Sequence, residues 1–214
     1  YKETQYQWLG NSYNFDFEFH DVQNVLAFAA PGLYIENGTS LKAEIDKEGR
    51  FKADMKSGRI AYKRNYMKNV SFEFDNTSNT LSGQMACDEI SASSIYMNDN
   101  LLNIHINDNH IGAGFSFDNH SESETRGELI INGTVTREDD APVFDIAIRP
   151  SSVHYNSREW YIQPSTLHIN GGDIDIDSFG VVSGEQSIGL FGRISDETEE
   201  LLTLNLERFD ISMI

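Results

Sequence analysis

The chain has little that could crosslink it or anchor it in a membrane. Cys87 is its only cysteine, so no intrachain disulfide can form, and no Cys/His cluster has the spacing of a zinc site. We interpret Cys87 as a small buried hydrophobic residue in a strand. There is no uninterrupted run of about 18 apolar residues, and no charged segment leads into an apolar one. We therefore expect any export signal or membrane anchor to lie outside this sequence, which we interpret as a fragment of a longer protein.

Positive charge is also scarce. The 214 residues include 16 Lys and Arg against 34 Asp and Glu, which gives a formal net charge of −18 that is spread along the chain. Such a surface repels phosphate backbones and anionic bilayers. Nucleic acid is therefore excluded as a ligand, because binding it depends on Lys and Arg side chains that displace counterions.

Catalytic signatures are missing as well. The sequence has no Gly-x-Ser-x-Gly elbow, phosphate-binding loop or dinucleotide fingerprint, and none of its six histidines forms an HxH or HxxxH pair. Asp173, Asp175 and Asp177 alternate with Ile174 and Ile176, which puts the carboxylates on the wet face of one strand. We predict that the protein is not an enzyme and uses no cofactor or metal.

What the sequence does have is strict alternation of apolar and polar residues, the period of a half-buried strand. The apolar members of these runs are Phe15/Phe17/Phe19, Leu41/Ala43/Ile45, Phe51/Ala53/Met55, Val70/Phe72/Phe74, Leu102/Ile104/Ile106, Phe115/Phe117, Leu129/Ile131, Phe144/Ile146/Ile148, Trp160/Ile162, Leu167/Ile169, Ile174/Ile176, Phe179/Val181, Ile188/Leu190 and Leu202/Leu204/Leu206. Turns are predicted at Asn37-Gly38, Glu48-Gly49, Ser57-Gly58, Asn132-Gly133, Asn170-Gly171-Gly172-Asp173 and Ser183-Gly184.

One segment has helical spacing instead. Val22, Val25, Leu26 and Ala29 precede a Pro31-Gly32 stop, so we predict one short helix near residues 22–30 that caps the sheet. The fold class is therefore all-β, with many short strands in an elongated, curled antiparallel or mixed sheet. Residues 118–128 have no apolar run and are typical of a hairpin loop or junction. We expect either two parts, 1–120 and 121–214, or one continuous domain.

Several C-terminal segments carry a resemblance to a known family. They are GELIINGTV at 127–135, IAIRPSSV at 146–153, EWYI at 159–162, INGGDIDI at 169–176, GEQSIGLFG at 184–192 and LNLERFDI at 204–211. In this order of strands and turns, the stretch from about residue 128 to 214 resembles the TamB-like bacterial envelope proteins, which are related to AsmA-like proteins. The short helix followed by glycine-punctuated strands in the N-terminal half is also similar.

The resemblance implies a periplasmic segment, anchored to the inner membrane through a part outside this sequence, whose strands curl into a β-taco or solenoid-like trough with an apolar interior. It implies a role in outer-membrane biogenesis, protein assembly and lipid transport, with phospholipid acyl chains, outer-membrane β-barrel proteins or the outer-membrane assembly machinery as partners. The apolar residues expected to line the trough form our candidate set: Phe144, Ile146, Ile148, Trp160, Ile162, Leu167, Ile169, Ile174, Ile176, Ile188, Leu190, Leu202, Leu204 and Leu206.

Two other readings remain open. A secreted carbohydrate-binding or adhesin-like β-sandwich would close its core and expose aromatic residues such as Trp8, although Trp160 is better explained as a core or sheet-face residue. An enzyme on a β-solenoid scaffold would need acidic residues that converge in one cleft. An open apolar face distinguishes the trough from the sandwich.

Overall fold

The computed structural model describes residues 10–78, 80–93, 95–119, 125–138, 141–155, 157–195 and 201–208, and it confirms the all-β prediction. The elements are β1 (Tyr13–Phe19), α1 (Gln23–Ala29), β2 (Leu33–Ile35), β3 (Thr39–Ile45), β4 (Phe51–Tyr62), β5 (Asn65–Asp75), β6 (Thr80–Ala92), β7 (Ile95–Asn107), β8 (His110–Asn119), β9 (Thr125–Glu138), β10 (Ala141–Ile148), β11 (Ser151–Tyr155), β12 (Arg158–Ile162), β13 (Ser165–Asn170), β14 (Asp173–Ser183), β15 (Gln186–Ile194) and β16 (Leu201–Glu207). Each predicted alternating run falls within a strand.

The chain divides into two compact units, Tyr1–Tyr96 and Met97–Ile214, and the division falls within β7. The boundary expected between residues 120 and 121 lies in the second unit. There, β8 and β9 pair along their lengths, from His110 opposite Thr134 to Asn119 opposite Thr125. Residues 120–124, the centre of the expected junction, lie outside the described part of the chain.

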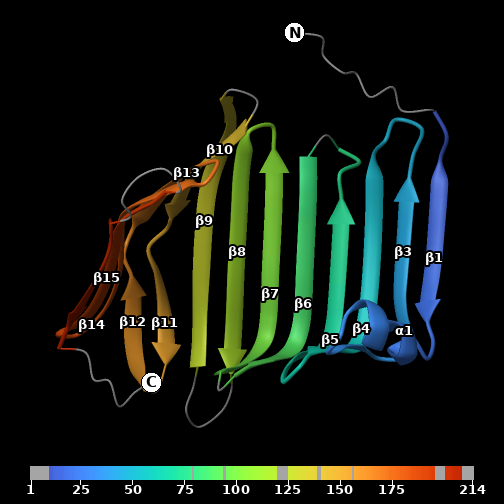
Figure 1. The fold of residues 1–214 in the computed structure, drawn as a ribbon, viewed down its shortest axis with the longest axis horizontal. Helices are drawn as coiled ribbons and strands as arrows, with labels where there is room; N and C mark the ends of the chain where they lie inside the picture. The colour runs from blue at the N-terminus through green and yellow to red at the C-terminus, as the bar shows by residue number, and fades with distance from the viewer. Residues whose placement is uncertain are drawn as a thin grey trace. The chain divides into compact units, whose positions relative to one another are not determined.

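The first unit is an antiparallel sheet in which β1, β3, β4, β5 and β6 follow one another (Figure 1). Its register places the predicted apolar runs on one face. Phe17 lies opposite Leu41, which lies opposite Met55, and Met55 lies opposite Phe72. β2 pairs with the later half of β4, so β2 and β3 together run along that strand.

The predicted helix is present as α1, shortened by one residue at each end. It packs near β2, but none of its residues is buried. The Val25 side chain is 66% exposed and that of Phe28 is 92% exposed. A capping helix would bury its apolar side chains on the sheet, but in α1 Leu26 is only half-buried, and Val25 and Phe28 face solvent.

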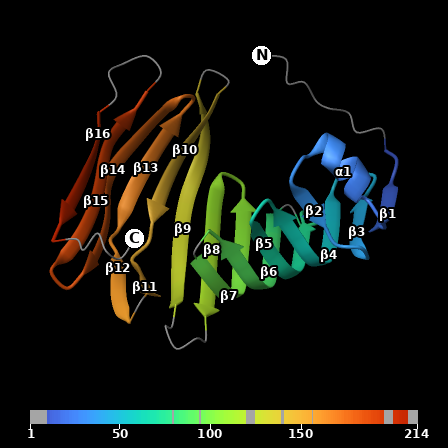
Figure 2. The same cartoon turned by 60° about the horizontal axis from the view of Figure 1, so that its bottom comes forward.

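The second unit is also an antiparallel sheet, and two of its strands are interrupted (Figure 2). β10 and β11 pair with β9 in nearly the same register, and β12 and β13 pair in turn with β11 and β10. Pro150 separates β10 from β11, and Pro164 separates β12 from β13. Proline lacks the N–H that a strand ladder needs. We therefore interpret β10 and β11 as one long strand broken at Pro150, and β12 and β13 as another broken at Pro164.

Two turn predictions are wrong. Ser57-Gly58 lies inside β4 and Asn132-Gly133 inside β9. Both glycines allow another part of the chain to approach the strand closely. A Cβ at Gly58 would lie 2.2 Å from Glu36 Oε2, and one at Gly133 would lie 2.7 Å from the carbonyl oxygen of Asp145. The other predicted turns are confirmed, and several of their glycines have positive φ, as at Gly38, Gly49 and Gly184.

Few apolar residues in the described part of the chain are buried. They are Ala61, Val70, Cys87, Val143 and Trp160, which confirms the predictions for Cys87 and Trp160. Most of the apolar strand residues are only half-buried. No helix in the described ranges is both long enough and apolar enough to cross a bilayer. A sheet with one apolar face normally covers it with a second layer, so the partial exposure of this face is the main feature of the fold.

Candidate functional site: an apolar sheet face

The strand register brings the whole candidate set onto one face of the second unit, which we call the apolar face. One cross-strand row runs from Ile146 through Leu167 and Ile176 to Gly192 and Leu202. The row beside it contains Phe144, Ile169, Ile174 and Ile194. Side chains in such rows stand about 5 Å apart, within contact distance of their neighbours.

The remaining candidates join the same face through β12, β14, β15 and β16. Ile162 lies opposite Val181, Val181 opposite Ile188, and Ile188 opposite Leu206. The register shift in β14 between Ile176 and Phe179 is what keeps both halves of this strand on the apolar face. Without it, the alternation would turn Val181 to the other side.

Exposure increases across the apolar face toward β16. Trp160 is buried, with 7% of its surface exposed, and the candidates on β10, β13, β14 and β15 are half-buried. Leu202, Leu204 and Leu206 are 46%, 59% and 53% exposed. The apolar face is therefore open at β16, where three leucines in one strand contact water.

The candidate set leaves out several members of this face, although their signal was the same period of two. Ile111, Ala113, Ile131, Val135, Val153, Phe179, Val181 and Ile194 share it, as the register shows. Val153 lies between Trp160 and Gly127 in one row. Gly127 leaves room for its neighbours, since a Cβ there would lie 2.9 Å from Val153 Cγ2 and 3.0 Å from Phe117 Cζ.

A buried polar residue lies on the apolar face. Ser165 lies opposite Ile148 and is buried, and its hydroxyl has no hydrogen-bond partner among the described residues. It follows Pro164, where the strand is broken, so it marks the point at which the two parts of the long strand meet. The side chains of the candidate set itself offer only carbon atoms and the Trp160 indole, which suits a ligand without polar groups.

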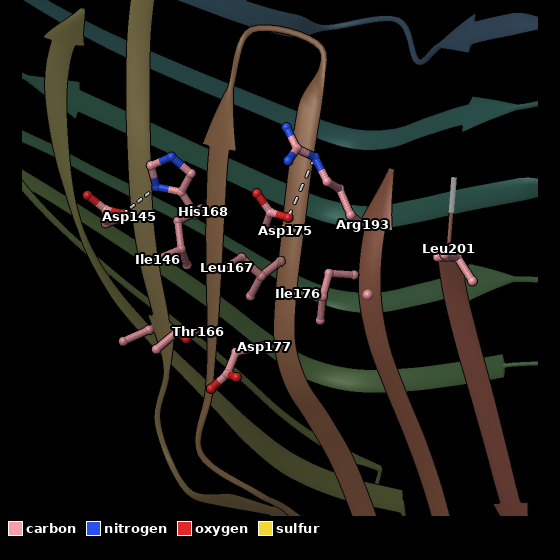
Figure 3. Close-up of a pocket in the computed structure, with 12 residues that line it drawn as sticks. Asp145, Ile146, Thr166, Leu167, His168, Asp175, Ile176, Asp177, Arg193 and Leu201 are labelled. Atoms are coloured by element: carbon pink, nitrogen blue, oxygen red, sulfur yellow. Dashed lines mark hydrogen bonds and ion pairs between the residues drawn. The ribbon is translucent and has the colours of Figure 1, made fainter. Parts of the chain in front are cut away.

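The opposite face of the second unit is polar and holds a shallow depression of about 750 Å³ (Figure 3). His168 Nδ1 lies 2.7 Å from Asp145 Oδ1 across the β10–β13 pair. Arg193 forms ion pairs with Asp173 and, at 3.7 Å, with Asp175. Asp145, His168, Asp175 and Arg193 in this depression are therefore paired and partly exposed, an arrangement typical of a solvated sheet face.

These pairs shift the titration of their members. The hydrogen bond to Asp145 raises the pKa of His168, and hydrogen bonds from Ser195 and Arg193 lower the pKa of Asp173. The register puts Asp173 and Asp175 on the face opposite Ile174 and Ile176, as the alternation predicts. Across the described ranges, no His, Cys, Asp and Glu side chains group closely enough to hold a metal ion.

Fold and site together define a class: an all-β sheet protein with a polar face and a partly open apolar face. Comparisons of this chain with protein-family models, with curated proteins and with solved structures give no match.

Proposed function

We propose that the second unit is a noncatalytic scaffold whose apolar face binds and shields phospholipid acyl chains during envelope biogenesis. The observation that supports this proposal is the gathering of the candidate set on one face that stays open at Leu202, Leu204 and Leu206. The resemblance of residues 128–214 to TamB-like proteins favours lipid as the occupant, in a periplasmic protein anchored to the inner membrane.

The energetics suit a long flexible chain. Covering an exposed aliphatic side chain contributes about 1.5–3 kcal/mol, and each CH₂ of an acyl chain that leaves water contributes about 0.8 kcal/mol. A row such as Ile146, Leu167 and Ile176 offers successive contacts without a polar group to desolvate. The acidic residues on the other face keep the loaded protein soluble, because a net charge of −18 opposes aggregation.

A second candidate ligand is an extended strand of an outer-membrane protein. Among the described strands, β16 pairs only with β15, so its other edge presents backbone groups to a further strand. Strand addition at this edge would extend the apolar face past Leu204. A closed sandwich, by contrast, requires a second sheet over these leucines, and they are about half exposed.

The test is lipid analysis of the purified chain. We expect organic extraction followed by mass spectrometry to recover phospholipid at about one or more molecules per chain. The triple variant Leu202→Ser, Leu204→Ser, Leu206→Ser should retain several-fold less lipid, because it removes the apolar edge of the face. Since the three leucines are about half exposed, their substitution should lower the free energy of unfolding only slightly.

Leu201→Ser is the matched control. Leu201 lies on the same strand and is 69% exposed, but it faces the polar side, opposite Arg193. Its substitution should leave lipid content unchanged. Lipid-free wild-type protein, or equal loss in this control, would contradict acyl-chain binding. Lipid-free protein that captures an unfolded outer-membrane protein would favour the strand ligand.

A further inference from the structure

The first unit has a second unusual surface, at the end of the sheet where the β4–β5 hairpin turns. Tyr62 and Asn65 close that hairpin, and Lys63 and Arg64 form its exposed tip. The Lys63 ammonium lies 5.1 Å from the centroid of the Tyr62 ring, which is itself 51% exposed. A cation and an aromatic ring therefore share one solvent-facing tip.

The end of α1 is tied to this tip. The Lys63 amide donates a hydrogen bond to the carbonyl of Gly32 at 2.8 Å. A Cβ at Gly32 would lie 3.2 Å from Lys63 Cγ, so the chain passes close to the lysine stem there. Figure 1 shows α1 at one end of the β4 strand. Phe28, in the last turn of this helix, is the most exposed large apolar residue of the described chain.

A neighbouring turn adds further apolar groups at the same end. The Ser93 amide donates a hydrogen bond to Asn65 Oδ1 at 3.0 Å, which joins the residues after β6 to the β4–β5 hairpin. Ile95 and Tyr96 follow, and both are about half exposed. We call the surface formed by Phe28, Tyr62, Lys63, Arg64 and Tyr96 the basic end.

The charge of this region is opposite to that of the protein. Between Asp54 and Glu73 the sequence contains no acidic residue, and it contains the cations Lys56, Arg59, Lys63, Arg64 and Lys68. The segments that build the basic end, 28–34, 62–65, 91–93 and 95–96, also contain no Asp or Glu. Lys68 is paired with Glu89 of β6 at 2.8 Å, so the positive charge of the basic end comes from Lys63 and Arg64, next to exposed aromatic rings.

We propose that the basic end docks on an anionic membrane surface. Exposed Phe and Tyr side chains insert at the depth of the headgroups, and Lys and Arg beside them are attracted to acidic lipids. Charge complementarity selects this partner, because the rest of the surface repels an anionic bilayer and orients the basic end toward it. This docking is separate from acyl-chain binding, which involves the second unit.

Sedimentation with vesicles tests the proposal on the full chain. We expect binding to vesicles of phosphatidylcholine with about one third phosphatidylglycerol, and none to phosphatidylcholine alone. Replacing Lys63 and Arg64 by alanine should weaken binding about 30-fold, since each cation near an anionic surface contributes about 1 kcal/mol. Phe28→Ser should weaken it about tenfold or more. Because all three side chains are exposed, circular dichroism should show unchanged folding.

The matched control carries Lys42→Ala and Lys47→Ala. Both lysines are exposed in the same unit but away from the basic end, and Lys47 lies in the turn between β3 and β4. This control should bind like the wild type. If Phe28→Ser fails to fold, the double alanine variant carries the test. Failure of the wild type to bind, equal binding to both vesicle types, or equal loss in the control would overturn the proposal.

The two sets of variants distinguish the basic end from the apolar face. The β16 leucine variant should keep its charge-selective vesicle binding, and the Lys63/Arg64 variant should keep its co-purified lipid. Vesicle binding that disappears with the leucines would assign it to the apolar face and overturn the basic end. A lipid-free dimer that Phe28→Ser abolishes would assign the surface to a second copy of the chain.

Discussion

At the scale of single residues, glycines in the strands decide how closely the backbone can be approached. A Cβ at Gly133 would collide with the carbonyl oxygen of Asp145, whereas a Cβ at Gly114 would have no atom within 4 Å. Both glycines lie in neighbouring strands of the second unit, β9 and β8. Both are glycines inside a strand, but packing requires only Gly133 to lack a side chain.

The two glycines should respond differently to alanine. Gly133→Ala forces a backbone shift in β10 and should lower the free energy of unfolding by about 1–3 kcal/mol. Gly114→Ala removes chain entropy from the unfolded state without a clash and should raise it by about 0.5–1 kcal/mol. Urea titration measures both. Equal effects at the two positions would contradict the assigned close approach.

At the scale of elements, cross-strand pairs on the polar face connect strands that are not consecutive in the sequence. Asp145 on β10 and His168 on β13 are joined by a hydrogen bond, and Asp175 on β14 adds negative charge near the imidazole. The hydrogen bond to Asp145 raises the pKa of His168 above its ordinary value of 6.5. The folded state therefore binds the proton of His168 more tightly than the unfolded state does.

The sign of the pH dependence follows from this shift. The stabilisation from protonated His168 is fully present below pH 6.5, and it is lost as the pH rises through the higher folded pKa. NMR titration should find the His168 midpoint above the ordinary value of 6.5. Asp145→Asn should lower the His168 midpoint, because it removes the hydrogen bond and the charge that raise it. A His168 midpoint insensitive to Asp145→Asn would refute the pairing.

At the scale of the whole molecule, excess negative charge opposes the compact state. The formal charge of −18 is spread along the chain, and the apolar side chains that are fully buried among the described residues are few. Self-repulsion therefore weighs heavily against a modest hydrophobic contribution. Salt screens this repulsion, since the Debye length falls to about 10 Å at 0.1 M.

Thermal unfolding should accordingly depend on ionic strength. Raising NaCl from about 10 mM to about 300 mM should increase Tm, by about 2–4 °C for each kcal/mol of repulsion removed. Sodium sulfate is not a suitable substitute, because it also strengthens apolar burial. A Tm that falls with NaCl would mean that attractive pairs such as Arg193 with Asp175 outweigh the net repulsion.

Much of this fold could be predicted because alternation with a period of two is a local property. The runs around Phe72, Ile146 and Ile176 could form only strands with one apolar side, and Pro31-Gly32 ended the short helix near its predicted position. Ser57-Gly58 and Asn132-Gly133 could not be judged in this way. Each glycine makes room for an atom of a residue distant in sequence: Glu36 Oε2 beside Gly58 and the Asp145 carbonyl oxygen beside Gly133.

The sequence by itself determined the strands, their apolar faces, the lone helix and the acidic surface, since each depends on neighbours within a few residues. Only the tertiary structure decided that the candidate set forms one face, because a shift of one residue in any pairing turns a strand over. It also decided that Leu202, Leu204 and Leu206 stay exposed and that the loop after α1 is hydrogen-bonded to Lys63 through Gly32. Burial and proximity depend on which segments pair, and local alternation carries no information about partners.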